Sequence, residues 1–414
     1  MITRRIFFRN SALAMVGVGT APLWLQRALY ASQGEASRKK VLVAIFQRGA
    51  ADGLNIVVPH GERAYYAVRP TIAIPRPATQ GEKAADAAID LDGFFGLHPM
   101  LAPLKPLFDQ QHLAIVDAVG SPDPTRSHFD AQDYMESGTP GVKATADGWM
   151  NRSLPPEQGK PSPLRAVSLG PVLPRSMRGS QPAIALESIG SFQIRNAEAA
   201  KAFEQLYEES RDPALRATGS ETFEAISLLQ AVQKEPYTPA GGAVYPRGRF
   251  GDSLRQIAQL IKAGVGLEMA FADIGGWDHH VNELGQRASE GQLANRLREY
   301  GQALGAFWQD MGDHMEDVVV VTMSEFGRTA HENGNRGTDH GHANAMFVMG
   351  GPVKGGKVYG RWPGLEKEQL YENRDLALTS DFRDVLAELV ARHLGNSSVA
   401  SVFPGYDPKF LGLV

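Results

Sequence analysis

Short apolar runs separated by amphipathic helical patterns constrain the fold of this chain more than any other feature. Apolar residues recur at helical spacing over residues 253–263, 293–315 and 382–394. Most of the apolar runs are continuous, as expected for strands that are covered on both faces. These strand candidates are residues 41–46, 113–119, 164–169, 267–272, 318–322 and 345–349. Strands that alternate with helices predict an α/β domain with a mainly parallel sheet.

Chain length and local composition set the expected domain organisation. A chain of 414 residues with 43% hydrophobic residues can bury one large core, or one core with a small cap. We therefore expect residues 37–414 to form a single domain. Residues 150–250 are rich in Pro, Gly, Arg and polar residues, with one good helical pattern around 223–233, and we expect an insertion or cap there.

Residues 1–36 have the features of an export signal. Arg4 and Arg5 precede an apolar stretch at 12–25, and small residues follow near Ala28 and Ala31. The arginine pair resembles a twin-arginine (Tat) signal, which predicts a periplasmic or secreted protein that the Tat export machinery recognises. An uncleaved membrane anchor is the alternative. The apolar stretch is shorter than the ~20 residues that a span needs, so we expect no membrane span in the mature protein.

Charge and cysteine content exclude several classes of function. The formal net charge is −4 and no basic stripe is visible, which argues against nucleic acid as a partner. The chain has no Cys, which excludes disulfides, thiolate nucleophiles and thiolate metal ligands. Any metal site must therefore use His, carboxylate, hydroxyl or amide ligands.

Polar residues follow four of the apolar runs, where the carboxyl ends of strands are expected. Ligands of open α/β sheets bind beyond these ends, so we expect the polar segments to meet along one rim. A further polar segment, 337–343, precedes the run 345–349. The candidate site residues are Arg48, Asp52, Arg126, Ser127, His128, Asp278, His280, Glu325, Arg328, Asp339, His340 and His342.

Each candidate also has an ordinary structural interpretation. Asp52 precedes Gly and suits a turn, and Ser127 suits the N-cap of a helix. Residues 337–343 could lie in a solvated loop because they contain two glycines. Asp278 and His280 are harder to explain in this way, because acids and imidazoles are costly to bury without partners. Taken together, the candidates favour a metal or anion site.

The motifs at the rim resemble those of a known family. They are RGAADGLN (48–55), GLHPML (96–101), TRSHFDAQ (125–132), GGWDHH (275–280), SEFGRT (324–329) and GTDHGHA (337–343). With the Tat-like leader, they resemble the DUF1501 family of bacterial exported proteins. That family belongs to the alkaline phosphatase-like superfamily, together with sulfatases and cofactor-independent phosphoglycerate mutases. The resemblance implies a three-layer, doubly wound α/β fold, but not a known reaction.

The resemblance also implies a site with one or two divalent metals at the carboxyl edge of the sheet. In chain order, the superfamily has a first Asp, a nucleophilic hydroxyl at a helix start, an Asp with His, an Asp-His pair and a final His. The residues that look like these elements are Asp52, Ser127, Asp278 with His280, and, as final histidine, His340 or His342.

Two departures from the superfamily pattern stand out. After the run 318–322, Ser324-Glu325 occupies the place of the Asp-His pair, and Asp339-His340 resembles that pair further downstream. Sulfatases mature a Cys or Ser in Cys/Ser-x-Pro-x-Arg, whereas this chain has Pro122 at that place. Sulfatase chemistry of the ordinary kind is therefore not expected.

The sequence thus predicts metal-assisted transfer of a phosphoryl or sulfuryl group from a small-molecule or polysaccharide ester. A divalent metal (Zn, Mn, Mg or Ca) would be held by Asp52, Asp278, His280, Glu325, Asp339, His340 and His342. Ser127 would attack, His128 would act as general acid or orient Ser127, and Arg48, Arg126 or Arg328 would clamp the anion. The alternative is an exported binding or assembly protein that has this fold and no turnover.

Overall fold

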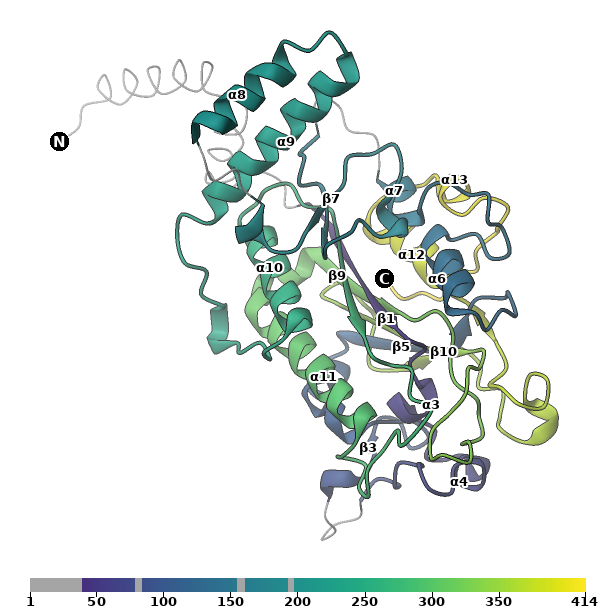
Figure 1. The fold of residues 1–414 in the computed structure, drawn as a ribbon. Coiled ribbons are helices and arrows are strands. Elements are labelled where there is room, and N and C mark those ends of the chain that lie inside the picture. Colours follow the sequence, from purple (N-terminus) through teal and green to yellow (C-terminus); the bar gives the residue numbers. More distant parts are fainter. Residues whose placement is uncertain (1–38, 79–83, 155–160, 193–196) are drawn as a thin grey trace.

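A nine-stranded sheet forms the centre of the protein, shown in Figure 1 as a computed structural model that describes residues 39–78, 84–154, 161–192 and 197–414. All six predicted strands are present, and three short ones join them. In chain order the strands are β1 (Val41–Arg48), β5 (Leu113–Gly120), β6 (Ala166–Leu169), β7 (Ile184–Leu186), β8 (Met269–Gly275), β9 (Val318–Met323), β10 (Asn344–Gly350), β11 (Val358–Tyr359) and β12 (Ser380–Asp381). The expected export signal lies outside the described residues.

The sheet is mainly parallel, as predicted. The strand order is β11-β5-β10-β9-β1-β8-β6-β7, and β12 also pairs with β5. Only β10 runs against its neighbours, β5 and β9, in the described part of the sheet. β1 lies between β8 and β9 and is parallel to both. The carboxyl ends of β1, β5, β8 and β9 therefore lie at one edge, and the amino end of β10 lies there with them.

Helices cover both faces of the sheet, which gives the expected three layers. Alternate residues of β1 face opposite layers. Val43 and Ile45 pack in one core with α10 (Arg249–Lys262) and α11 (Gln292–Met311). Ala44 and Phe46 pack in the other core with α6 (His128–Ser137), α7 (Trp149–Ser153), α12 (Phe382–Glu388) and α13 (Val399–Val402). The α/β prediction is confirmed.

Short elements complete the fold around the first strand. The helices α3 (Gly53–Ile56), α4 (Arg63–Val68) and α5 (Lys105–Asp109) belong to this region. Strands β2 (Val57–Val58), β4 (Gly96–Leu97) and β3 (Ile89–Asp90) form a separate antiparallel sheet. Among the described residues, no helix combines the length and apolar character needed to cross a membrane.

The segment expected as an insertion or cap, 150–250, has a mixed structure. It supplies β6 and β7, which extend the main sheet beyond β8. It also contains α8 (Ala197–Glu208) and α9 (Pro213–Val232), which pack on each other at the top of Figure 1. In that view they stand far from α3, which follows the carboxyl end of β1. These two helices therefore do not cover the predicted rim.

Candidate metal centre

The antiparallel direction of β10 brings the segment 337–343 to the predicted rim. Asn344, the first residue of β10, pairs with Val119 near the carboxyl end of β5. Just before β10, His340 pairs with Arg328 in an isolated antiparallel bridge. The segment that follows β9 and the segment that precedes β10 therefore lie side by side. No long loop is needed to return His340 to the edge of the sheet.

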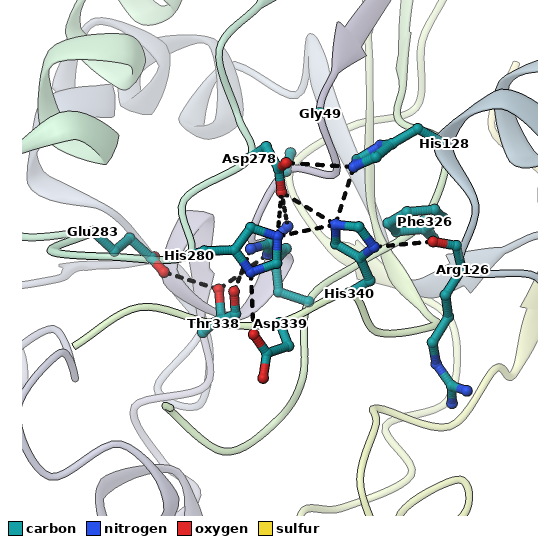
Figure 2. A network of polar contacts seen from close by, with 12 residues as sticks. Gly49, Arg126, His128, Asp278, His280, Glu283, Phe326, Thr338, Asp339 and His340 are labelled. Carbon is teal, nitrogen blue, oxygen red and sulfur yellow. Dashed lines mark hydrogen bonds and ion pairs between the residues drawn. The ribbon is translucent and has the colours of Figure 1, made fainter. Parts of the chain in front are cut away.

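Four side chains from three distant segments form one network of contacts at this rim, and we call them the His–Asp cluster: His128, Asp278, His280 and His340 (Figure 2). The Nε2 atom of His340 lies 3.0 Å from Nε2 of His128 and 3.1 Å from Nε2 of His280. Asp278 Oδ1 lies 2.9 Å from His280 Nε2 and 3.3 Å from His340 Nε2, and its Oδ2 lies 3.5 Å from His128 Nε2.

The other ring nitrogen of each histidine is bound to an oxygen that can only accept a hydrogen bond. His128 Nδ1 donates to Glu325 Oε1 at 2.8 Å and His280 Nδ1 donates to Asp339 Oδ1 at 3.1 Å. His340 Nδ1 donates to the Arg126 carbonyl oxygen at 2.9 Å. In a neutral imidazole only one nitrogen carries a proton, so each Nε2 directs a lone pair into the cluster when its ring is neutral. Such lone pairs repel one another and the carboxylate unless a proton or a metal cation lies between them, so the arrangement can bind a cation.

Asp278 is held in place by Arg328. The Arg328 guanidinium donates from Nη1 to Asp278 Oδ1 at 2.6 Å, and it is itself fixed by Nε and Nη2 hydrogen bonds to Thr338. Burial acts to raise the pKa of Asp278, but the hydrogen bond and charge of Arg328 outweigh it and hold the pKa below its ordinary value. Asp278 is therefore a carboxylate that can serve as a ligand at neutral pH.

The histidines differ in their tendency to hold a proton. The hydrogen bond from His128 to Glu325 raises the pKa of His128, whereas burial lowers the pKa of His340. Glu325 remains ionised because its hydrogen bonds, with that of His128 foremost, outweigh burial and lower its pKa. Neutral His340 and ionised Glu325 are the states that a metal centre requires.

The donor set fits a divalent transition metal. Imidazole nitrogen suits Zn, Cu, Fe and Ni, whereas Mg and Ca prefer oxygen ligands. A tetrahedral site with metal–nitrogen bonds of about 2.0–2.1 Å has donor–donor distances of about 3.3 Å. The donor atoms of His128, Asp278 and His340 all lie within 4.8 Å of one another, and His280 approaches Asp278 at 2.9 Å and His340 at 3.1 Å. Each donor also has the outer hydrogen-bond partner that metal ligands usually have.

Glu325 and Asp339, both predicted as metal ligands, lie behind histidines instead. Glu325 Oε1 accepts from Gly49 N at 2.8 Å, from Gln132 Nε2 at 3.0 Å and from His128. Asp339 Oδ1 accepts from His280 and from Asn333. The carboxylates thereby orient two imidazoles. His128, predicted as a general acid or as the residue that orients Ser127, lies in the cluster, where Glu325 was expected.

Asp52, the predicted first ligand, does not face the cluster. Both of its carboxylate oxygens accept from the buried guanidinium of Arg69, one of them at 2.9 Å. Burial acts to raise the pKa of Asp52. The charge and hydrogen bonds of Arg69, together with a hydrogen bond from Glu283, outweigh burial and lower this pKa. Burial and the Asp52 charge raise the pKa of Glu283 well above its ordinary value. A protein cation thus occupies the place where a metal was expected.

The remaining predicted residues have other partners. Ser127 begins α6 as its N-cap, but its side chain is exposed and makes no capping hydrogen bond. His342 is buried and stacks on Tyr371 with ring centroids 4.5 Å apart. The Arg126 side chain pairs with Glu372 and Asp375, each at 2.6 Å. These three residues therefore do not supply side-chain atoms to the cluster.

Two predicted arginines serve the site indirectly. Arg328 positions Asp278, and Arg48 pairs with Glu136 at 3.0 Å and with Asp273 at 2.9 Å. Gln132 donates to Glu325 and accepts from Arg48, so it links the two regions. Sequence reasoning missed Gln132, although its position one helical turn after His128 was a usable signal.

Comparisons with known proteins identify a family for this chain. A family model described as "Protein of unknown function (DUF1501)" matches residues 111–402. No curated protein matches. The chain resembles the PsFucS1 sulfatase from Pseudoalteromonas sp., with 13% identity, a TM-score of 0.40 and coverage of 94% of this chain and 75% of that chain. It also resembles the lipoteichoic acid synthase LtaP from Listeria monocytogenes, with 9% identity, a TM-score of 0.32 and coverage of 78% and 68%. Likenesses this weak carry no argument about function.

Proposed function

This chain belongs to the DUF1501 family of proteins of unknown function, and from its site we propose that it is an exported, metal-dependent hydrolase or transferase acting on a phosphate or sulfate ester. The observation that carries the proposal is the contact of three Nε2 atoms and one carboxylate at one rim, each held by a hydrogen bond from its other side. Zinc is the first candidate, because three imidazoles and a carboxylate suit its tetrahedral geometry.

Ester chemistry is supported by the accessibility of the cluster. The side chains of Asp278 and His280 are 42% and 40% exposed, and those of His128 and His340 are 25% and 24% exposed. A buried structural site would be closed to solvent, whereas an anionic ester can approach this one. A bound divalent cation supplies charge stabilisation for the ester oxygens and for the attacking group. The chain's own contribution is to hold the four donors and to orient them through Glu325, Asp339 and Arg328.

The second candidate is a binding or assembly protein without turnover. It is favoured by the exposed position of Ser127 and by the ion pairs that already engage Arg48 and Arg126. In the described residues, no side-chain contact joins Ser127, Arg48 or Arg126 to the cluster, and the third predicted clamp, Arg328, is engaged by Asp278. The cluster could then serve as a site for a structural cation.

One experiment separates these functions. Purified protein is stripped with chelator, reloaded with Zn, Mn, Mg or Ca, and assayed on aryl phosphate and aryl sulfate esters, with metal content measured on the same samples. We expect one equivalent of zinc and zinc-dependent hydrolysis that is lost in Asp278→Asn. Full metal occupancy without hydrolysis of any ester would favour the binding protein. Protein that binds no metal would overturn both readings of the cluster.

Export remains part of the proposal and has its own test. The pair Arg4-Arg5 is the feature that Tat-type machinery reads. Replacing both arginines by lysine keeps the charge and should retain the protein in the cytoplasmic fraction. Fractionation that finds this variant in the periplasm or medium at the normal level would exclude Tat export.

A further inference from the structure

A cavity of about 410 Å³ lies beside the His–Asp cluster and has no role in the metal site. Its volume falls within the range of about 300–1,000 Å³ that is typical of small-molecule pockets. Its walls come from the end of β1, from α6, from the loop after β6, from the start of α10 and from β8. It therefore opens on the same side of the sheet as the cluster.

The cavity adjoins the cluster through α6. Phe129, on the cavity wall, directly follows the ligand His128 in the chain. Gln132, also on the wall, donates to the Glu325 carboxylate that orients His128. A molecule that fills the cavity thus lies within one turn of α6 from the metal ligand.

Charges on the cavity wall do not cancel completely. Four arginines and three acids line it. Arg48 is neutralised by Glu136 and Asp273, with pair distances of 3.0 and 2.9 Å, and Arg175 by Asp133 at 2.5 Å. The wall therefore carries one net positive charge, and the two arginines outside these pairs are both exposed.

Those two arginines are Arg178 and Arg249. Arg249 is 61% exposed and forms a long ion pair of 3.9 Å with Asp273, which Arg48 also binds, so its guanidinium keeps donors available. Arg178 is exposed and donates from Nε to the Leu173 carbonyl oxygen, and its terminal nitrogens have no hydrogen-bond partner among the described residues. Planar guanidinium groups bind phosphate, sulfate or carboxylate oxygens in pairs. The mouth of the cavity therefore favours an anion.

Apolar surface lies at the same mouth. Phe129 is 89% exposed and Val172 is 65% exposed, although both are large apolar side chains. A single exposed apolar residue needs no explanation. Two of them beside a cavity that also presents exposed guanidinium groups form the usual combination of a ligand pocket, which is an apolar or aromatic surface with a few polar groups that fix orientation.

We propose that this cavity binds one anionic sugar unit of the substrate, with the ring against Phe129 and the charged substituent on Arg178 and Arg249. The neutralised pairs of Arg48 and Arg175 offer further donors and acceptors to the ring hydroxyls. The cavity's role as a substrate subsite rests on the proposed ester chemistry. Binding of the sugar to the cavity does not depend on that chemistry, so the experiment measures binding alone.

The experiment measures binding by calorimetry of the metal-loaded protein with glucose 6-phosphate, with glucose and with inorganic phosphate as separate probes. The test variants are Arg178→Gln with Arg249→Gln, and Phe129→Ala. The matched control is Arg247→Gln, an exposed arginine two residues before Arg249 that does not line the cavity. The variant Asp278→Asn distinguishes binding in the cavity from binding at the metal centre.

We expect the sugar phosphate to bind more tightly than either glucose or phosphate. The double arginine variant should weaken it at least tenfold, Phe129→Ala should weaken the sugar phosphate but not phosphate, and Arg247→Gln should change neither. Binding should persist in Asp278→Asn. Binding that disappears in Asp278→Asn and survives in the double variant places the anion on the metal and overturns the proposal. The proposal is also overturned if no probe binds, or if Phe129→Ala does not change the affinity for the sugar phosphate. If the protein hydrolyses no ester, these binding results are unaffected. Failure of the proposed ester chemistry can therefore be distinguished from failure of the proposed sugar site.

Discussion

Glu325 Oε1 accepts a hydrogen bond from His128 Nδ1 at 2.8 Å, and this contact decides which nitrogen of His128 faces the His–Asp cluster. Glu325 is almost fully buried and receives hydrogen bonds from Gly49 and Gln132 at the same oxygen. Its orientation is thus fixed by the ends of β1 and α6 together.

Replacing Glu325 by Gln should weaken metal binding about 10- to 100-fold, the usual effect of losing an outer partner of a ligand. The amide retains the shape and the acceptor oxygen but removes the charge that supports the imidazole. Competition with a chromophoric zinc chelator measures the change. Glu372→Gln, which alters a carboxylate paired with the Arg126 side chain, is the control. Equal zinc affinity in the Glu325 variant and the parent would exclude the orienting role.

Two histidines in one motif should respond differently to mutation. His340 contributes Nε2 to the cluster, whereas His342 stacks on Tyr371. We expect His340→Ala to reduce the zinc content from one equivalent towards zero. His342→Gln should keep the metal and lose some stability, because a buried ring contact is removed. Elemental analysis of the two purified variants checks this, and equal metal contents would mean that the ligand is assigned to the wrong histidine.

The buried pair of Asp52 and Arg69 should matter for stability and not for metal content. Asp52→Asn leaves the Arg69 guanidinium buried without its counter-charge, so we expect a loss of about 3–5 kcal/mol in the free energy of unfolding. The matched control is Asp109→Asn, which removes an exposed pair with Lys105 and should change the free energy by less than about 1 kcal/mol. Urea unfolding and elemental analysis measure both properties. Loss of metal from folded Asp52→Asn protein would restore Asp52 as a ligand.

Asp117 should make stability fall as pH rises. It is buried in β5, its Oδ2 has no hydrogen-bond partner within the described ranges, and burial raises its pKa to about 7. An acid whose pKa is higher in the folded protein than in the unfolded chain stabilises the fold at low pH. That contribution is present below the unfolded value of about 4 and is lost as the pH rises through about 7, and three pKa units correspond to at most about 4 kcal/mol.

Asp117→Asn tests this directly because an amide cannot ionise. The variant should be more stable than the parent at about pH 8, and the difference should shrink at about pH 5. Urea unfolding at both pH values gives the comparison, with Asp109→Asn as the exposed control. A stability difference that does not change with pH would show that Asp117 titrates normally.

The fold could largely be predicted from the sequence because the long central strands are buried on both faces. Runs such as 41–46 and 318–322 are apolar throughout, and the structure places both at the centre of the sheet. The direction of β10 was not readable, since an apolar run has the same appearance whichever way it pairs. That direction is what returns His340 to the rim.

Most residues of the site could be predicted from the sequence, but their roles could be predicted only in part. The sequence shows which acids and imidazoles follow the strands, and the structure brings five of the seven predicted ligands together with His128. Whether a carboxylate faces the cluster or lies behind a histidine depends on side-chain direction and on the choice of imidazole nitrogen. Glu325 and Asp339 are such cases. Asp52 was misassigned because its partner, Arg69, lies in no motif that indicates a buried cation.

The three segments that build the His–Asp cluster are far apart in the chain: Asp278 lies 150 positions after His128, and His340 lies 62 positions after Asp278. A cation shared among them is a cross-link that closes two long loops, and such links restrict the unfolded chain most when the loops are long. In a chain without cysteine, a bound ion would thus restrict the unfolded chain in the way that disulfides do in other proteins. Chelation would then lower the melting temperature as well as the reactivity, and would loosen α6 and the β9–β10 connection in a single event.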